Sequence, residues 1–362
     1  MTLSVMQVLH QGGGAGSVIS TLHLSLGLAR AGIHVRFVCP PDSEVESLAR
    51  AGGLQVHPLR LLPRQHRKNA AALSELLAGN RVDLVNSQSS IDRQALAWLA
   101  LTGRLPVPLV LTRRQMPLTF FLENWLVSRA AARVIAVSQA VGDALVRRGT
   151  PRRKLSVIHN GVVTDRIDVP VSSRALEEWK GRIGWEPSRR TIGIVARLKD
   201  QEVVVRALGR VTTPVRLVLA GVDPTSHVGA LGARVPERHA VVCLPFTTDV
   251  RPLYELLELA LLPSRMEGLS QGLLEAMALA KPVIASASTG NLELVRDNQN
   301  GRLVPPRDSG AWGVAIEELL TDRAAALRLG QAARITAREE FSMARTVERT
   351  LTLYRSLLTA SS

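Results

Sequence analysis

Repeated alternation of short apolar runs with segments of helical spacing constrains the fold of this chain most. The first run, Leu3–Leu9, leads into a glycine loop, after which Ser17 is a candidate helix cap. The following segment has one apolar helical face, made by Ile19, Leu22, Leu26 and Ala29. His34–Cys39 is the next apolar run. A strand, a helix and a second strand in this order favour a right-handed crossover and a parallel sheet.

The alternation occurs in two series. In the first series we expect further strands at 82–86, 109–112, 134–137 and 155–158, with helices at 92–101, 121–131 and 140–147. Residues 162–188 predict a linker with a helix near 176–182. In the second series we expect strands at 191–196, 215–220, 240–244, 259–263 and 282–285, helices at 202–210, 250–257 and 272–280, and only helices after that. The sequence therefore predicts an α/β protein with two doubly wound domains, 1–168 and 169–340, and a final segment 341–362.

Composition limits the class of protein. The 362 residues are 46% hydrophobic and 21% charged, which excludes general disorder. The only cysteines, Cys39 and Cys243, exclude a disulfide framework and a cysteine-based zinc site, and we expect both to be reduced core thiols. The first residues have neither the basic segment nor the long apolar segment of a secretory signal. No apolar run in the sequence is long enough to span a bilayer. We expect a cytoplasmic protein, free or peripheral on the inner face of the cell membrane.

The charge balance is basic. Lys+Arg is 45 and Asp+Glu is 31, a net charge of +14, and the segment 104–154 holds ten basic residues but only two acidic ones. Such a segment attracts nucleic acid, acidic lipid headgroups or phosphorylated substrates, unless it is only a solvated face. Aromatic residues are 3% of the chain, which argues against the stacking that single-stranded nucleic acid requires.

A glycine run, Gly12–Gly16, stands between the first predicted strand and helix. Glycine lets a ligand approach the backbone, and a helix N-terminus favours an anion. The run does not fit G-x-G-x-x-G, and no clear acidic residue closes the next strand, so a nicotinamide site is not favoured. A tight turn remains the alternative.

The most informative segment follows the strand predicted at 259–263. It places Glu267 and Glu275 on either side of a loop with small and polar residues, and Glu275 in the first turns of a helix. Carboxylates accept from sugar hydroxyls, and loop N–H groups donate to an anionic or polyhydroxylated ligand. Two solvated glutamates near a helix start would give the same pattern.

The chain resembles the retaining, GT-B-fold glycosyltransferases of family 4, also called glycosyltransferase group 1. Glu267 and Glu275 match the E-x7-E signature of this family. The resemblance covers nearly the whole chain and includes, in order, Gly13-Gly14, Ser138-Gln139, Asn160-Gly161, Arg197-Leu198, Thr289-Gly290, Glu293-Leu294-Val295 and 300–306. It implies two Rossmann-like domains facing a central cleft, with a last helix around 346–358 that returns to the first domain.

The resemblance also implies roles for residues. Arg197 and Lys199 would hold the donor diphosphate, and Glu267 would contact donor-sugar hydroxyls; these are the candidate catalytic residues. Glu275 would accept from the nucleotide ribose. The remaining donor-binding candidates are Gly13, Gly14, Gly221, Leu244, Phe246, Gly268, Leu269, Ser270, Gln271 and Gly272. The acceptor-binding candidates in the first domain are Gln88, Arg113, Arg114 and Asn160.

Three positions depart from the family pattern. Lys199 follows Arg197 after a single residue, whereas the family usually has a longer loop. Gln88 stands near the place of a histidine found in many relatives, and His159 replaces a proline. Glutamine can bond a sugar hydroxyl but cannot exchange a proton. In the front-face mechanism ascribed to this family, the departing diphosphate oxygen takes the acceptor proton, so no protein base is required.

The expected function is retaining transfer of a hexose from a UDP- or GDP-sugar to a glycan or lipid-linked acceptor of the cell envelope. No metal site or other cofactor is expected, because the fold implies none and the chain has no Asp-x-Asp pattern. Arg64, Arg67 and Lys68 would favour an anionic acceptor or membrane surface, and we do not expect nucleic acid as a partner. Phe120, Phe121, Trp125 and Leu126 could contact lipid, but their helical spacing favours core packing. The alternatives are a nucleotide-sugar epimerase or hydrolase of the same fold, and a non-catalytic basic protein.

Overall fold

The computed structural model describes residues 2–13, 15–117, 120–247 and 249–359. The chain divides into two compact units, which we describe separately. The first contains Met1–Gly161 and Met343–Ser362, and the second contains Val162–Ser342. The chain thus enters the second unit after Gly161 rather than after Asp168, and leaves it after Ser342 rather than after Glu340. The reason is that residues 162–168 are bonded within the second unit: Arg251 donates to the carbonyl oxygen of Ile167, and Arg338 pairs with Asp168.

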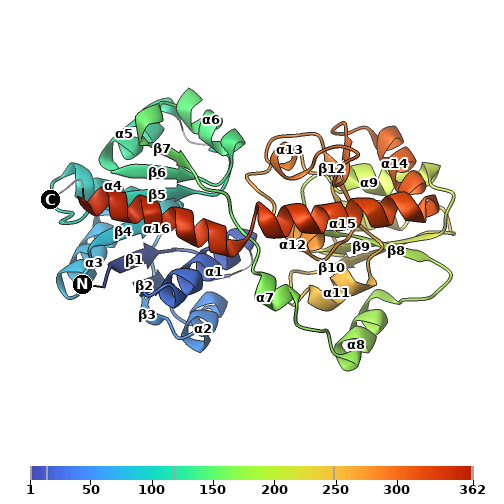
Figure 1. Cartoon of the computed structure of the whole chain (residues 1–362), viewed down its shortest axis with the longest axis horizontal. Coiled ribbons are helices and arrows are strands. Elements are labelled where there is room, and N and C mark those ends of the chain that lie inside the picture. Colours follow the sequence, from blue (N-terminus) through green and yellow to red (C-terminus); the bar gives the residue numbers. More distant parts are fainter. Residues whose placement is uncertain (1, 14, 118–119, 248, 360–362) are drawn as a thin grey trace. The chain divides into compact units, whose positions relative to one another are not determined.

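The first unit is a parallel seven-stranded sheet with the order β3-β2-β1-β4-β5-β6-β7 (Figure 1). Its strands are β1 (Ser4–Val8), β2 (His34–Cys39), β3 (Gln55–Pro58), β4 (Leu84–Ser87), β5 (Leu109–Arg113), β6 (Arg133–Ala136) and β7 (Leu155–Val157). Its helices are α1 (Gly16–Arg30), α2 (Glu44–Ala51), α3 (His66–Ala78), α4 (Ser90–Leu101), α5 (Phe121–Ala130), α6 (Gln139–Arg147) and α16 (Met343–Thr359). The strand order reverses between β1 and β4, because the chain first builds β2 and β3 on one side of β1 and then returns to the other side.

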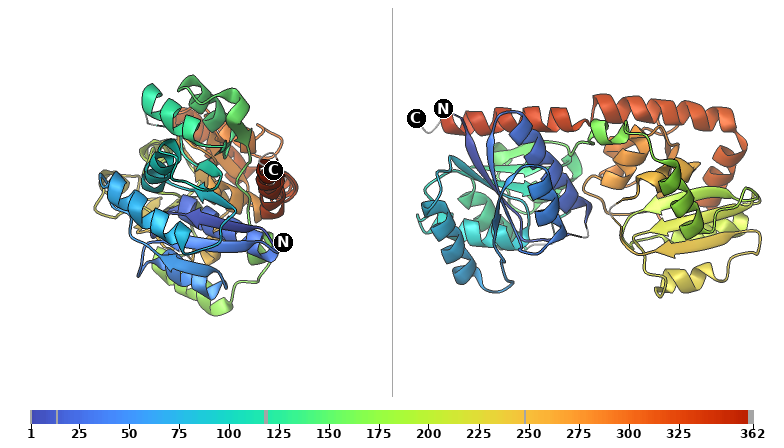
Figure 2. Two further views of the ribbon diagram at one scale, coloured as in Figure 1. Left: turned by 90° about the vertical axis from the view of Figure 1, so that its left-hand side faces the viewer. Right: turned by 90° about the horizontal axis from the view of Figure 1, so that it is seen from below.

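The last helix, α16, packs against α1, and the two lie side by side in both views of the unit (Figures 1 and 2). A Cβ atom added to Gly27 of α1 would lie 2.5 Å from Cγ2 of Val347, so the two helices approach closely at this glycine. The helix is also anchored by a polar contact, since the buried hydroxyl of Tyr354 accepts from Asn86 of β4 at 2.6 Å.

The second unit is a parallel six-stranded sheet with the order β10-β9-β8-β11-β12-β13. Its strands are β8 (Arg190–Val195), β9 (Val215–Ala220), β10 (Ala240–Leu244), β11 (Leu259–Leu262), β12 (Val283–Ser286) and β13 (Arg302–Val304). Its helices are α7 (Thr164–Ile167), α8 (Ser173–Ile183), α9 (Glu202–Ala207), α10 (His227–Gly232), α11 (Arg251–Leu256), α12 (Gln271–Ala278), α13 (Asn291–Leu294), α14 (Ser309–Thr321) and α15 (Arg323–Glu339). Here the order reverses between β8 and β11.

Several sequence expectations need correction. Helix α1 begins at Gly16 with Ala15 as its N-cap, so Ser17 lies inside the helix and does not cap it. Strand β13 lies in the region where only helices were expected. Residues 162–188 are not a plain linker, because they carry α7 and α8 of the second unit.

The cysteines are free thiols, as expected, but only Cys39 is fully buried. Burial raises the pKa of the Cys39 thiol to about 12. Burial also raises the pKa of Cys243, which is partly exposed.

Candidate functional site

In both sheets, predicted functional residues follow the two strands between which the strand order reverses. Ligands of doubly wound sheets bind outside the carboxyl ends of the strands at this point. In the second unit, Arg197 and Lys199 follow β8, and Glu267 follows β11. In the first unit, Gln88 follows β4, while Gly12 and Gly13 lie on the turn that follows β1.

The two loops of the second unit are tied together by Asp200. Its carboxylate accepts from the backbone N–H of Arg265 at 3.0 Å and from Nε of the same residue at 2.7 Å. Gln201 in turn donates to the carbonyl oxygen of Arg197 at 2.8 Å. These contacts hold the loop after β8 against the loop after β11.

Lys199 and Glu267 form an ion pair between Nζ and Oε1. The Glu267 side chain is only 11% exposed and that of Lys199 is 36% exposed, so the pair has a solvent-facing side and a buried side. The backbone N–H of Glu267 donates to Oγ1 of Thr289 at 2.9 Å. Close to this pair in sequence, the Arg197 side chain is exposed and bonds to no described residue. The segment Arg197-Leu198-Lys199 therefore carries two cations, of which Lys199 is paired with a carboxylate and Arg197 bonds to no described residue.

The loop between the two glutamates packs closely on other backbone segments. A Cβ atom on Gly290 would lie 2.0 Å from the carbonyl oxygen of Gly268, and one on Gly272 would lie 2.5 Å from that of Val195. Gly268, Leu269 and Ser270 are buried, while Gln271 and Gly272 are partly exposed. Ser270 caps α12 by accepting from the N–H of Leu273 at 3.3 Å. The first turn of this helix thus begins at the strand reversal, and the N-terminus of a helix favours an anion.

Tyr254 of α11 positions Glu275, and no pattern in the sequence singled out this tyrosine. Its hydroxyl donates to the carbonyl oxygen of Gly272 at 2.9 Å and lies 3.4 Å from Oε2 of Glu275. Burial, and then the charge of Glu275, raise the pKa of Tyr254 well above its usual value, so the hydroxyl keeps its hydrogen. Glu275 itself is partly exposed.

The remaining donor candidates of the second unit lie at the ends of β9 and β10. Gly221 has a φ of +100°, and a Cβ atom there would lie 2.8 Å from the carbonyl oxygen of Ala196. The N–H groups of Gly221 and Val222 both donate to the carbonyl oxygen of Leu244, at 2.9 and 3.0 Å. Phe246 is 44% exposed just beyond. Gly221 thus lies against the start of the loop after β8, and Leu244 is bonded to it.

In the first unit three of the four acceptor candidates meet in one buried network. Arg114 donates through Nη1 to Oδ1 of Asn160 and through Nη2 to Oε1 of Gln88 at 3.0 Å. Gln88 donates to Oε1 of Gln7 at 2.6 Å. Burial lowers the pKa of Arg114 to about 10, no ion pair of its guanidinium is found in the described part of the chain, and its Nε atom is buried without a partner.

Arg113 is not part of this network. It points to the other face of the sheet, where Nη1 donates to Oδ1 of Asn124 in α5 at 2.9 Å. Burial, and then the like charge of Arg93, lower its pKa to about 9. The structure therefore places Arg113 under α5, apart from the other three candidates. Of the first glycines, Gly13 is exposed beside Glu44, and Gly14 lies outside the described residues.

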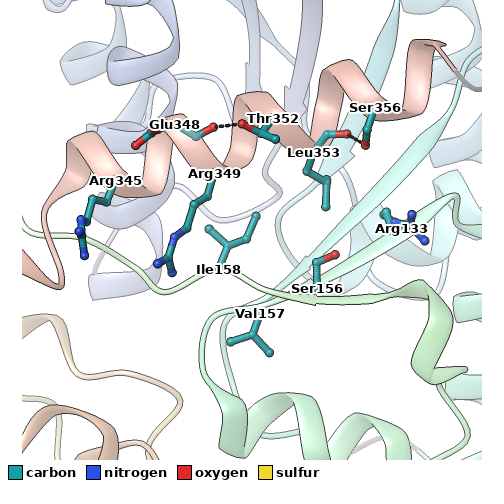
Figure 3. A pocket seen from close by; sticks show the side chains of 10 residues that line it. All are labelled: Arg133, Ser156, Val157, Ile158, Arg345, Glu348, Arg349, Thr352, Leu353 and Ser356. Atoms are coloured by element: carbon teal, nitrogen blue, oxygen red, sulfur yellow. Dashed lines mark hydrogen bonds between the residues drawn. The ribbon is translucent and has the colours of Figure 1, made fainter.

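A groove of about 540 Å³ runs between β7 and α16 in the first unit (Figure 3). It is lined by Arg133, Ser156, Val157, Ile158, Arg345, Glu348, Arg349, Thr352, Leu353 and Ser356. None of the candidate residues lines it. In the described part of the chain no three His, Cys, Asp or Glu side chains are grouped to hold a metal ion, and no helix there has the length and apolarity to cross a membrane.

Comparisons with known proteins agree with this geometry. Residues 14–166 match Glycosyltransferase Family 4, and residues 189–322 match Glycosyl transferases group 1. Alpha-maltose-1-phosphate synthase of Mycobacterium tuberculosis is 30% identical over an alignment of length 373, which covers 90% of this chain and 95% of that protein. EpsD of Bacillus subtilis is 32% identical over 58% of this chain, and this match spans 56% of EpsD, about half its length.

Among solved structures, Anabaena HepE in complex with UDP-glucose superimposes with a TM-score of 0.81 at 19% identity, covering 98% of this chain and 100% of that one. The fold is therefore that of the GT-B glycosyltransferases, two Rossmann-like α/β domains. The chain belongs to glycosyltransferase family 4, the group 1 glycosyltransferases.

Proposed function

We propose that the chain transfers a hexose from a nucleotide-sugar donor, with retention of configuration, to a glycan or lipid-linked acceptor of the cell envelope. The observation that carries this proposal is a pair of contacts in the segments that precede and form α12, Lys199 with Glu267 and Tyr254 with Glu275. A cation and two carboxylates beside a helix N-terminus suit a diphosphate joined to two sugars. HepE is described as a complex with UDP-glucose, which supports a nucleotide-sugar donor.

Each side chain of this site has a proposed task. The exposed Arg197 guanidinium and the Lys199 ammonium neutralise charge on the departing diphosphate. Glu267 accepts from the hydroxyls of the transferred sugar, and Glu275, positioned by Tyr254, accepts from the ribose. Binding diphosphate would draw Lys199 away from Glu267, which then becomes free for a sugar hydroxyl.

We infer an anionic acceptor from the first unit. Arg64, Arg67 and Lys68 are exposed at or near the start of α3, close to the carboxyl edge of the sheet. Alpha-maltose-1-phosphate synthase is named for a phosphorylated product, so a phosphate-bearing acceptor is known among relatives. Glucose 1-phosphate is therefore a direct first probe, because a glucosyl transfer to it gives a maltose 1-phosphate.

A peripheral membrane position is the second part of the proposal, and α5 supports it. Core packing was the favoured role for its apolar residues, and that was wrong for three of them: Phe120 is 84%, Phe121 59% and Leu126 39% exposed. Leu122 is 64% exposed. The helix instead buries Asn124, Val127 and Ser128.

Two arginines, Arg129 and Arg148, lie close to this helix. The Arg129 guanidinium lies 5.5 Å from the Trp125 ring, and the Asn124 side chain donates to the carbonyl oxygen of Arg148 at 3.0 Å. The ring of Phe121 lies against Gly149. Apolar side chains flanked by cations are typical of helices that lie in an anionic lipid interface.

Vesicle sedimentation tests this position. We expect binding to vesicles of phosphatidylglycerol and phosphatidylcholine, and loss of most binding in Phe121→Ser/Leu122→Ser. Leu327→Ser, a change at an equally exposed leucine of α15, is the matched control. Equal binding of all three proteins would contradict the role of α5.

Product analysis tests the reaction itself. With an α-linked nucleotide hexose and glucose 1-phosphate, proton NMR should show an α-linked product. A β-linked product would contradict retention. Conversion of the donor without an acceptor, to free sugar or to an epimeric donor, would favour the hydrolase or epimerase alternative.

A further inference from the structure

The groove between β7 and α16 belongs entirely to the first unit. Strand β7 is the last strand of the seven-stranded sheet, and α16 packs against α1, which leaves a hollow between the helix and this edge strand. Its volume of about 540 Å³ is that of a site for a small molecule rather than for a single ion. Of the described residues that line it, only Val157, Ile158 and Leu353 are apolar, which is too few to enclose an acyl chain.

Three arginines converge on this groove. Arg345 and Arg349, one helical turn apart on α16, extend toward β7, and Arg133 of β6 lies on the same side of the helix (Figure 3). Like charges four positions apart on a helix repel each other. Glu348 is the one acidic side chain among the described lining residues, and no ion pair within the described part of the chain joins it to Arg133 or Arg349. An anion in the groove would relieve this repulsion.

The positive charge continues beyond the groove at Arg133. Its Nη1 donates to the carbonyl oxygen of Arg153 at 2.7 Å. Nζ of Lys154 donates to the carbonyl oxygens of Arg129 at 2.7 Å and Ala131 at 2.6 Å. Burial, and then the charges of Arg153, Arg129 and Arg133, lower the pKa of Lys154. None of these four cations forms an ion pair with a described residue, so their summed field adds to that of the arginines in the groove.

The polar groups of the lining suit a phosphate that carries a sugar. Guanidinium groups bind phosphate through paired N–H donors. The hydroxyl of Ser156 bonds to no described residue, and its oxygen, like the Glu348 carboxylate, can accept from a sugar hydroxyl. A phosphate ion alone would fill only part of the groove.

We propose that this groove binds a small phosphorylated sugar. Its phosphate lies among Arg133, Arg345 and Arg349, and its hydroxyls bond to Ser156 and Glu348. The groove shares no residue with the candidate donor and acceptor sites, and the inference does not depend on the proposed transfer reaction.

The groove borders the two segments through which the chain leaves and re-enters the first unit. Ile158 lies three residues before Gly161, where the chain leaves, and Arg345 lies two residues after Met343, where it returns. The Thr346 hydroxyl already donates to the carbonyl oxygen of His159 at 2.9 Å. A ligand bonded to both β7 and α16 would hold these segments together, so we expect it to slow their hydrogen exchange.

Isothermal titration tests the binding. The probes are glucose 6-phosphate and mannose 6-phosphate, with glucose and inorganic phosphate as their fragments. We expect saturable binding of a hexose phosphate, at least tenfold tighter than that of either fragment. Arg349→Gln should weaken it about tenfold, because it removes a charged partner of the phosphate. Arg355→Gln, at an exposed arginine of the same helix outside the groove, should match the wild type.

Hydrogen exchange locates the bound molecule. With the hexose phosphate at saturation, amides of 155–161 and 343–356 should exchange more slowly in the wild type and in Arg355→Gln, but not in Arg349→Gln. Amides of 88–92, at the carboxyl edge of the sheet, should not change. Protection of 88–92 in place of the groove segments would assign the ligand to the acceptor candidates and overturn the groove site.

Three further results would overturn the proposal. One is no binding of either hexose phosphate, or binding that Arg349→Gln leaves unchanged. Another is binding of inorganic phosphate as tight as that of the hexose phosphates, which would mean an adventitious ion only. The third is sedimentation with phosphatidic acid vesicles that Arg349→Gln abolishes, without binding of a hexose phosphate, which would assign the groove to a lipid headgroup. None of these measurements requires sugar transfer, so this site and the proposed function can fail independently.

Discussion

Gly272 is a residue at which the second unit cannot take a side chain without displacing part of its candidate site. A Cβ atom there would lie 2.5 Å from the carbonyl oxygen of Val195 and 3.3 Å from the Tyr254 hydroxyl. Gly272→Ala should therefore move the start of α12 away from β8, lower the free energy of unfolding by about 1–3 kcal/mol and abolish nucleotide binding.

Gly209→Ala is the matched control, because nothing lies within 4 Å of a Cβ atom at that position. Urea unfolding and isothermal titration with UDP, GDP and ADP measure the two effects. Equal nucleotide affinity in both variants would show that the close approach of Gly272 to β8 does not matter for binding.

Asp92 gives the first unit a dependence on pH. Burial alone would raise the pKa of this carboxyl, but hydrogen bonds from His10, Ser87 and Ser89 outweigh it. The folded pKa therefore lies below the unfolded value, so the carboxylate stabilises the fold above the unfolded pKa, and this stabilisation is lost as the pH falls through the folded pKa. The wild type should therefore lose stability between neutral and strongly acidic pH more steeply than Asp92→Asn. Melting temperatures of both proteins from pH 7 downward measure the difference, and parallel curves would contradict it.

Sequence patterns found the residues whose partners are close along the chain. Glu267 and Glu275 lie on one loop and the helix that follows it, so their spacing suggested either a shared site or two solvated glutamates, and the family resemblance favoured the site. His10 and Asp92 are separated by 82 positions, and only the pairing of β1 with β4 brings them together. Tyr254 gave no signal for the same reason, because its contact with Glu275 depends on how α11 packs.

Helix α16 is anchored to the first sheet by the hydroxyl group of one residue, Tyr354. Tyr354 accepts from Asn86 at 2.6 Å and from Gln7 at 3.2 Å, and all three side chains are buried. Tyr354→Phe leaves two buried amide groups without an acceptor, which costs about 2 kcal/mol. Amides of peptides from 343–359 should exchange hydrogen about thirtyfold faster in this variant.

Thr352→Ala, on the exposed side of the same helix, should leave exchange unchanged. If Tyr354→Phe also left it unchanged, the contacts of α16 with α1 alone would hold the helix in place.

Strands were predictable where apolar residues form a long run in the sequence. Strands β9 and β10 have the bounds expected from their apolar runs, 215–220 and 240–244. Strands β3 and β13 were missed because they have only four and three residues and are largely half-exposed. The burial of α5 was misjudged because Asn124, a polar residue, faces inward, where Arg113, Thr150 and a carbonyl oxygen satisfy its amide.

The topology of the two sheets limits the possible functions of the molecule more than its composition does. The net charge of +14 is compatible with several anionic partners. In contrast, the strand order of the first sheet reverses between β1 and β4, and that of the second reverses between β8 and β11. These two reversals place polar loops at defined edges of the sheets. The family match then identifies the class of reaction. The donor base, the donor sugar and the acceptor depend on side-chain contacts with molecules that neither spacing nor topology identifies.

The most direct test of the account is thermal stability against UDP, GDP, ADP and their glucose conjugates. One nucleotide series at about 100 times its Kd should add about 2.7 kcal/mol of stability to the wild type. Glu237→Ala, at an exposed glutamate of the second unit, should gain the same stabilisation, and Glu275→Ala should lose it. Stabilisation of Glu275→Ala equal to that of the wild type, or no stabilisation by any of these ligands, would contradict the donor site at the start of α12.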